Sequence, residues 1–150
     1  MGILDNVLRG RRDDADLGKG LWRRAHDRFQ RGLDRYHQVL EGVEDDELYA
    51  ELVVMADALS ALLPRVRAVC AKCQRLAPSD DFDVPGDLAD VHRALSKAGN
   101  ALATTAEAAA MLSLAVGPVP VGALSVQRRA ATVLEHVELA EQLAGLRAAG

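Results

Sequence analysis

The chain has 150 residues, of which 49% are hydrophobic and 27% charged, and its formal net charge is −4. These values are typical of one soluble globular domain, and they exclude an intrinsically disordered chain. Aromatic residues make up 3% and Ile3 is the only isoleucine, so the residues that strands prefer are scarce. The negative charge also excludes a dedicated nucleic-acid-binding protein, which needs a concentrated basic surface.

The charge is distributed unevenly along the chain. Residues 1–40 contain nine Lys and Arg against six Asp and Glu, a balance of +3, whereas residues 41–150 carry −7. The start of the chain lacks the sustained apolar core of a signal peptide. The excess of Arg over Lys and of Ala over Ile suggests a GC-rich genome. We therefore expect a bacterial cytoplasmic protein with reduced thiols, either free in the cytoplasm or peripheral at the inner membrane face.

Residues 1–15 are predicted to be a short amphipathic segment followed by a charged linker. Four apolar residues share one face of a short helix, and a basic cluster follows. The apolar residues are Ile3, Leu4, Val7 and Leu8, and the cluster is Arg9, Arg11 and Arg12. Burying these side chains only balances the cost of ordering the segment, so it needs a surface to fold against. That surface is the end of its own bundle, a partner protein, or the headgroup region of a membrane.

The rest of the chain, residues 16–150, is predicted to form four long helices. Apolar residues repeat at alternating spacings of four and three, the pattern that a helix buries against neighbours at a shallow angle. The helices are expected over residues 16–41, 45–77, 87–116 and 121–148, with a bend at Pro64. Because short loops favour antiparallel neighbours, the predicted fold is all-α: an antiparallel up-down-up-down four-helix bundle with a short N-terminal amphipathic segment.

The last predicted helix is apolar over a broad face. Its expected inward residues are Leu124, Ala131, Leu134, Val137, Ala140 and Leu143. Three more apolar residues lie outside that set, namely Val126, Val133 and Leu139. This surplus of apolar surface suggests a homodimer contact through the last helix.

An aromatic stripe marks the first long helix, because Trp22, Phe29 and Tyr36 recur every seven residues. Large rings fit well against alanine-rich helices, so we expect these three residues in the packed core. The alternative is a small-molecule sensor with a pocket that has these rings as its walls.

Cys70 and Cys73 are three residues apart and therefore share one face of a helix. Together with His92 as a third donor, the two thiols are candidates for part of a zinc site. By themselves they are candidates for a redox pair. However, Cys73 completes an apolar seam, and both lie near the C-terminal end of their predicted helix, where the dipole does not lower a thiol pKa. We expect buried structural thiols with no metal and no cofactor, and keep a thiol or metal-binding protein as the alternative.

Val116, Val119 and Val121 give the turn between the last two predicted helices an unusual apolar character. They either cap the core or form a contact patch. The chain shows no phosphate-binding loop and no nucleophile elbow. We therefore expect a non-enzymatic interaction or adaptor module that binds a partner protein or the inner membrane surface through its N-terminal segment.

Overall fold

A computed structural model describes residues 2–79, 81, 83–115 and 123–148. Over these residues the chain forms helices and turns without any strand, which confirms the predicted all-α class. The helices are α1 (Ile3–Leu17), α2 (Leu21–Glu41), α3 (Asp46–Ser60), α4 (Leu63–Leu76), α5 (Ala89–Ser113) and α6 (Leu124–Leu143), with a 3-10 turn, η1 (Gly86–Leu88), before α5. Among the described helices, none combines the length and the apolar character that a membrane span requires.

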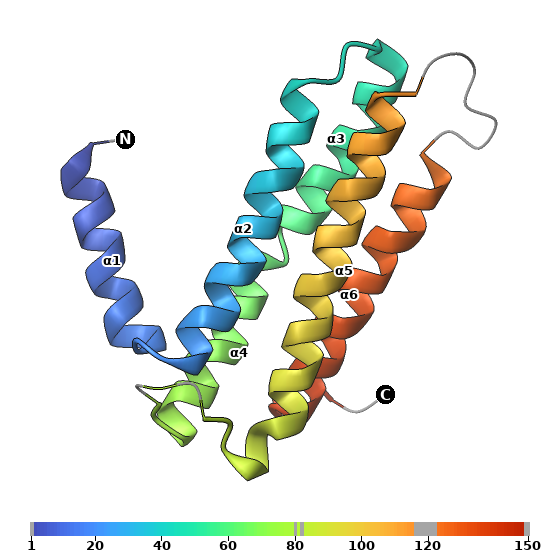
Figure 1. Ribbon diagram of the computed structural model, residues 1–150. Helices are drawn as coiled ribbons and strands as arrows, with labels where there is room; N and C mark the ends of the chain where they lie inside the picture. Colours follow the sequence, from blue (N-terminus) through green and yellow to red (C-terminus); the bar gives the residue numbers. More distant parts are fainter. Residues whose placement is uncertain (1, 80, 82, 116–122, 149–150) are drawn as a thin grey trace.

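Helices α2 to α6 form a body around one core, and α1 leans away from it (Figure 1). Helix α2 contacts α3, α4 and α5, and α6 contacts α5 on one side and α3 and α4 on the other. These contacts close a ring, so that each helix of the body buries one face toward the middle. Helix α1 contacts α2 and α4.

The core combines the aromatic stripe of α2 with small side chains of α5. Trp22, Phe29 and Tyr36 are at most 1% exposed, as predicted for core residues. Helix α5 contributes the buried alanines Ala94, Ala98, Ala106 and Ala109. The two helices approach so closely that a Cβ atom on Gly32 would lie 2.9 Å from side-chain atoms of Leu102. Large rings on one helix therefore pack beside small residues on the next.

The second predicted helix is interrupted where only a bend was expected. Helix α3 ends at Ser60 and α4 begins at Leu63, with Pro64 in its first turn. Proline has no N–H to donate to the Ser60 carbonyl, and its ring crowds that carbonyl, so the hydrogen-bond ladder fails here. Ala61 and Leu62 nevertheless keep right-handed helical dihedral angles. The chain therefore loses helical hydrogen bonds at this point without leaving helical conformation.

The break between α1 and α2 lies at residues 18–20, and the expectation of a linker before residue 16 was wrong. Gly18 has a φ of +71°, a left-handed conformation that favours glycine. Gly20 lies against the loop after α4, where a Cβ atom would be 2.4 Å from the Asp81 carbonyl oxygen and 2.6 Å from that of Ser79. Gly10 and the charged residues after it belong to α1.

Helix α6 is rotated relative to the prediction. Its buried residues are Val126, Val133, Val137 and Ala140, with Ala130 partly buried, and they keep the spacing of four and three. Four residues expected to point inward, Leu124, Ala131, Leu134 and Leu143, are exposed. Two of the three residues expected in a dimer contact, Val126 and Val133, are fully buried, so of that set Leu139 alone reaches the surface.

The C-terminal end of α6 comes earlier than residue 148 because a glycine stops the helix. Gly145 has a φ of +74° and its N–H donates to the Gln142 carbonyl oxygen at 3.0 Å. The Leu146 N–H donates to the Glu141 carbonyl oxygen at 2.8 Å. This pair of hydrogen bonds is the Schellman motif, which satisfies the last carbonyl groups and ends a helix.

Candidate functional site

The distal half of α1, residues 3–12, carries an apolar face that is largely exposed. Ile3 is 85% exposed and Leu4 70%, and Val7 and Leu8 are about half exposed. Figure 1 shows α1 extending away from the body, with its N-terminal end well separated from α2. The structure therefore does not place these four side chains on the end of their own bundle, which was one of the expected surfaces.

The apolar residues lie on a different face of α1 from the residues that hold it to the body. Asp13 and Leu17 are buried and Gly10 is partly buried. At about 100° per residue, the apolar residues centred on Leu4 and Val7 point roughly 120° away from that buried face. The geometry of the helix thus keeps its apolar face turned outward even though α1 is attached to the body.

Ion pairs attach the other end of α1 to α2 and α4. Arg67 of α4 donates hydrogen bonds to Asp13 and, at 3.0 Å, to Asp16. Arg23 of α2 donates to Asp14 at 2.7 Å and lies 3.8 Å from Asp13. Asp13 is only 7% exposed, so it sits between two guanidinium groups with little water around it. These three of the four carboxylates of α1 are therefore paired within the molecule.

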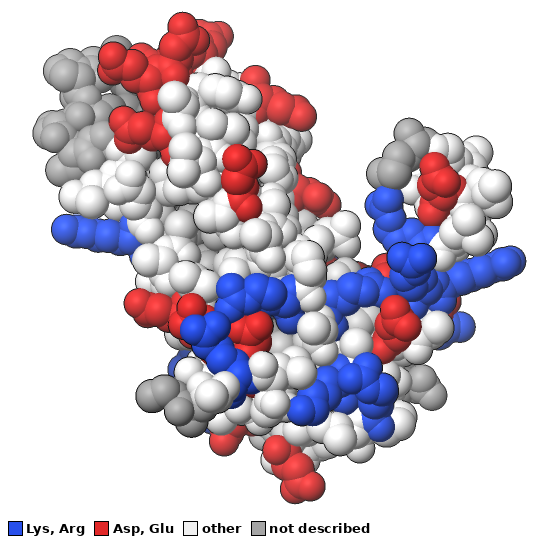
Figure 2. Space-filling model, turned by 180° about the vertical axis from the view of Figure 1, so that it is seen from behind, with Lys and Arg blue, Asp and Glu red and all other residues white. Residues whose placement is uncertain are grey.

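The distal half of α1 retains a surplus of positive charge. It contains Asp5 against Arg9, Arg11 and Arg12, a net charge of +2. Figure 2 shows the molecule from behind, with Lys and Arg gathered where α1 meets the lower part of the body and a group of Asp and Glu at the upper end. The distal half of α1 consequently combines an exposed apolar face with a positive formal charge.

Both cysteines are buried in the core as free thiols. Burial, with a smaller contribution from Cys73, raises the pKa of the Cys70 thiol. Burial raises the pKa of Cys73 to about 11. The thiolate is the reactive and metal-binding form, so both groups are inert near neutral pH. No set of three His, Cys, Asp or Glu side chains in the described ranges is placed to hold a metal ion, and His92 does not complete one with these thiols.

The aromatic stripe serves the core and does not form the walls of the neighbouring pocket. The Tyr36 hydroxyl donates a hydrogen bond to the carbonyl oxygen of Leu52 at 2.8 Å. The Trp22 ring meets the His92 ring nearly edge-on, with centroids 6.0 Å apart. Trp22 Nε1 is the one buried side-chain nitrogen or oxygen without a hydrogen-bond partner in the described part of the chain. Trp22 therefore lies beneath a surface feature that His92 helps to form.

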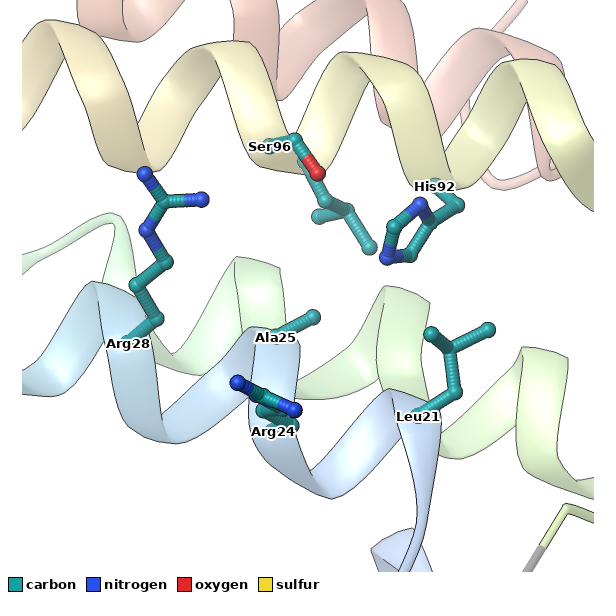
Figure 3. A pocket seen from close by; sticks show the side chains of 7 residues that line it. Leu21, Arg24, Ala25, Arg28, His92 and Ser96 are labelled. Atoms are coloured by element: carbon teal, nitrogen blue, oxygen red, sulfur yellow. The ribbon is translucent and has the colours of Figure 1, made fainter. Parts of the chain in front are cut away.

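That surface feature is a pocket of about 270 Å³ between α2 and α5 (Figure 3). Its lining residues are Leu21, Arg24, Ala25, Arg28, His92, Leu95 and Ser96. Leu21 and Leu95 are each 5% exposed and give the pocket an apolar floor. Figure 3 shows the Arg28 guanidinium reaching from α2 toward α5, and His92 and Ser96 reaching from α5 into the same space. Three polar side chains from two helices thus converge on one small cavity.

The pocket has a positive electrostatic character. Burial first, and then the charge of Arg28, lower the pKa of His92. Arg28 donates a hydrogen bond to the amide oxygen of Asn100, which is uncharged and does not neutralise the guanidinium. His92 is therefore neutral at neutral pH and is able to donate one N–H and accept at its other ring nitrogen.

Sequence reasoning did not find this pocket, although a signal for it exists. Four arginines of α2 follow one another at spacings of four, three and four: Arg24, Arg28, Arg31 and Arg35. The last three line a second hollow along the same pair of helices, together with Gly32, Gly99, Ala103 and Glu107. The excess of basic residues in the first 40 positions was visible, but its concentration along one helical face beside α5 was not recognised.

The apolar turn residues Val116, Val119 and Val121 lie outside the described residues. Comparison with known proteins gives no match to a family model, to a curated protein or to a solved structure. The function must therefore be argued from the surfaces of this chain.

Proposed function

We propose that this protein is a non-enzymatic interaction module that docks the distal half of α1 onto an anionic membrane surface. The observation that carries the proposal is the 85% exposure of Ile3 and 70% exposure of Leu4 on a helix whose other face is fixed to the body. An amphipathic helix of this kind lies in the plane of the headgroups with its apolar side chains inserted. Arg9, Arg11 and Arg12 supply the attraction to anionic lipids.

The expected affinity is modest. The four apolar side chains expose roughly 400 Å², which is worth roughly 10 kcal/mol if all of it leaves water. Insertion of about half this area, with about 1 kcal/mol for each net positive charge, gives roughly 7 kcal/mol. That corresponds to a dissociation constant on the order of 10 µM before other association costs. Because α1 is already folded and anchored, the ordering cost that opposes binding of a free peptide is reduced.

The body serves in this proposal as the platform that presents α1. We infer that α2, the α3–α4 pair, α5 and α6 are the four members of an antiparallel up-down-up-down bundle, with α1 as its appendage. The ring of contacts among these helices supports this topology. The proposed location is the bacterial cytoplasm, at the inner face of the membrane.

The proposal is tested by co-sedimentation with vesicles of anionic and of neutral phospholipids. We expect the full chain to sediment with anionic vesicles and to lose at least tenfold in affinity on Leu4→Glu substitution. The matched control is Met111→Glu, which places the same charge on an equally exposed apolar residue of α5. A variant beginning at Asp13 keeps the anchoring carboxylates and removes the distal half, so it is expected not to sediment.

Two results would overturn the membrane proposal. Equal and negligible sedimentation of the full chain and of the variant beginning at Asp13 leaves α1 as a site for a partner protein. Equal losses for Leu4→Glu and Met111→Glu would show that added negative charge, and not the apolar face of α1, controls sedimentation.

A further inference from the structure

The pocket between α2 and α5 has the composition of an anion-binding site. Arg24, Arg28, His92 and Ser96 supply the polar groups among its described lining residues, and none of those described residues is a carboxylate. Guanidinium, imidazole N–H and hydroxyl groups all donate hydrogen bonds. An apolar floor beneath them lowers the local dielectric constant, so that their attraction for an anion is stronger than it would be on an open surface.

The donors approach the cavity from several directions. Arg28 comes from α2 and its guanidinium reaches α5, whereas Ser96 and His92 come from neighbouring turns of α5 further along the same side of the pocket (Figure 3). A planar carboxylate accepts its strongest hydrogen bonds within one plane, as in bidentate pairing with one arginine. A tetrahedral phosphate instead presents oxygens in several directions. The arrangement of the three side chains therefore suits a phosphate group better than a carboxylate.

The size of the cavity limits what carries that phosphate. Pockets for drug-sized ligands occupy roughly 300–1,000 Å³, and this one is about 270 Å³. It accommodates a phosphate group with a small organic substituent. Arg28 also lines the second hollow, of about 350 Å³, which lies along the same pair of helices.

We propose that the pocket formed by Arg28, His92 and Ser96 binds the phosphate group of a small soluble phosphate monoester. Arg28 neutralises the charge, and His92 and Ser96 donate hydrogen bonds to other oxygens of the phosphate. The proposal concerns a different surface from the apolar face of α1 and does not depend on membrane binding.

The fluorescence of Trp22 gives a direct readout, because it is the only tryptophan of the chain and its ring contacts His92. We expect saturable changes on titration with glycerol 3-phosphate and with inorganic phosphate. Glycerol and chloride at matched ionic strength are expected to give none. Phosphate should also raise the pKa of His92, followed by its ring proton resonances, because a nearby anion stabilises the imidazolium form.

Substitutions separate the site from general charge effects. Arg28→Gln is expected to weaken binding of glycerol 3-phosphate at least tenfold, and Ser96→Ala about threefold to tenfold. Arg11→Gln removes the same charge from α1 and is expected to change affinity by less than twofold. Arg28 and Arg11 are both exposed, so neither substitution should prevent folding.

Three outcomes would overturn the proposal. The first is a fluorescence change that chloride reproduces at the same ionic strength. The second is an unchanged affinity for glycerol 3-phosphate in Arg28→Gln. The third is a response to anionic phospholipid vesicles without any response to soluble phosphates, which would assign the pocket to a lipid headgroup.

Discussion

Replacing Asp13 by Asn removes the charge that holds α1 on the body, and the size of its effect follows from the ion pairs. Asp13 is 7% exposed, accepts a hydrogen bond from Arg67 and lies 3.8 Å from Arg23. Hydrogen bonds to charged groups contribute about 1.5–3 kcal/mol, and exposed ion pairs about 0.2–1 kcal/mol. The two arginine side chains are 23% and 27% exposed, so their ion pairs with Asp13 are partly screened by water. We therefore expect Asp13→Asn to weaken the docking of α1 by about 2 kcal/mol in total, between the value for an exposed ion pair and the upper value for a charged hydrogen bond.

This loss should release α1 without unfolding the body. A 15-residue helix is marginal by itself in water, so an undocked α1 loses most of its helical structure. The core around α2 and α5 keeps its aromatic packing, since Leu17 is the only apolar residue of α1 that is fully buried. About 2 kcal/mol corresponds to roughly a 30-fold increase in the opening equilibrium. Amide hydrogens of α1 are therefore expected to exchange roughly 30-fold faster, with little change in α5.

Hydrogen exchange followed by mass spectrometry measures both helices in one experiment. Asp14→Asn is the matched control, because it changes the same charge one position along α1. Its carboxylate is 44% exposed and pairs with Arg23 at 2.7 Å, so we expect less than about 1 kcal/mol and at most a fivefold acceleration. Unchanged exchange of α1 in Asp13→Asn, or equal acceleration of α1 and α5, would refute this account of how α1 is attached.

Three further predictions concern the core and the turns. Val133→Ala should destabilise the protein by about 2–3 kcal/mol and Leu134→Ala by less than about 1 kcal/mol in denaturant unfolding, because Val133 is fully buried and Leu134 is 37% exposed. Gly20→Ala should lower the free energy of unfolding by more than about 1 kcal/mol, since the added Cβ atom would meet backbone oxygens. Gly10→Ala should instead raise it by about 0.5–1 kcal/mol, and thermal denaturation measures both effects. The two thiols should resist a thiol reagent at pH 8 until denaturant is added, and prompt reaction of the native protein would contradict this. The free energy of unfolding should also fall as the pH rises above about 9, because the thiols of the unfolded chain ionise there while burial holds the pKa of Cys73 near 11.

The helical class and much of the core could be predicted from the sequence because one physical effect dominates them. Apolar residues of α5 follow the alternating spacings of four and three from which the helices were predicted, and Val91, Leu95 and Leu102 among them are buried. The aromatic stripe at Trp22 and Phe29 was likewise placed in the core. In both cases the large apolar side chains lie on one face of an amphipathic helix, and burying them is favourable. The local periodicity of the sequence is therefore sufficient to predict which residues enter the core.

The extent of α1 and the register of α6 depend on contacts between distant residues. The charged run after Gly10 looked like a linker, because Arg67, which pairs with Asp13 and Asp16, lies more than 50 positions away. In α6 the expected inward set included Leu124, Leu134 and Leu143 and left out Val126 and Val133. The close packing of α5 against α6 favours small and β-branched residues such as Val133, and leaves Leu134 outside. Hydrophobicity alone would place Leu134 in the core ahead of Val133, which is the reverse of what the structure shows.

The pocket between α2 and α5 was missed for a related reason. Arginines at spacings of four and three normally indicate a solvated helix face, and that interpretation needs no partner helix. Only the fold shows that Arg28 crosses to α5 and that His92 and Ser96 meet it there. A basic stripe becomes a candidate site when a second helix supplies donors beside it, and the sequence alone does not reveal which helix that is.

Arg23 and Arg28 of α2 lie in different electrostatic environments, and this difference yields a further test of the phosphate site. Arg23 forms ion pairs with carboxylates of α1 and with Asp27. The described hydrogen-bond partner of Arg28 is the uncharged amide of Asn100. Asn100→Asp would place a fixed carboxylate beside Arg28 and neutralise its guanidinium from within the molecule. We expect at least a tenfold loss of phosphate affinity by Trp22 fluorescence, with vesicle sedimentation unchanged. Undiminished phosphate binding in this variant would mean that the charge of Arg28 does not select the ligand.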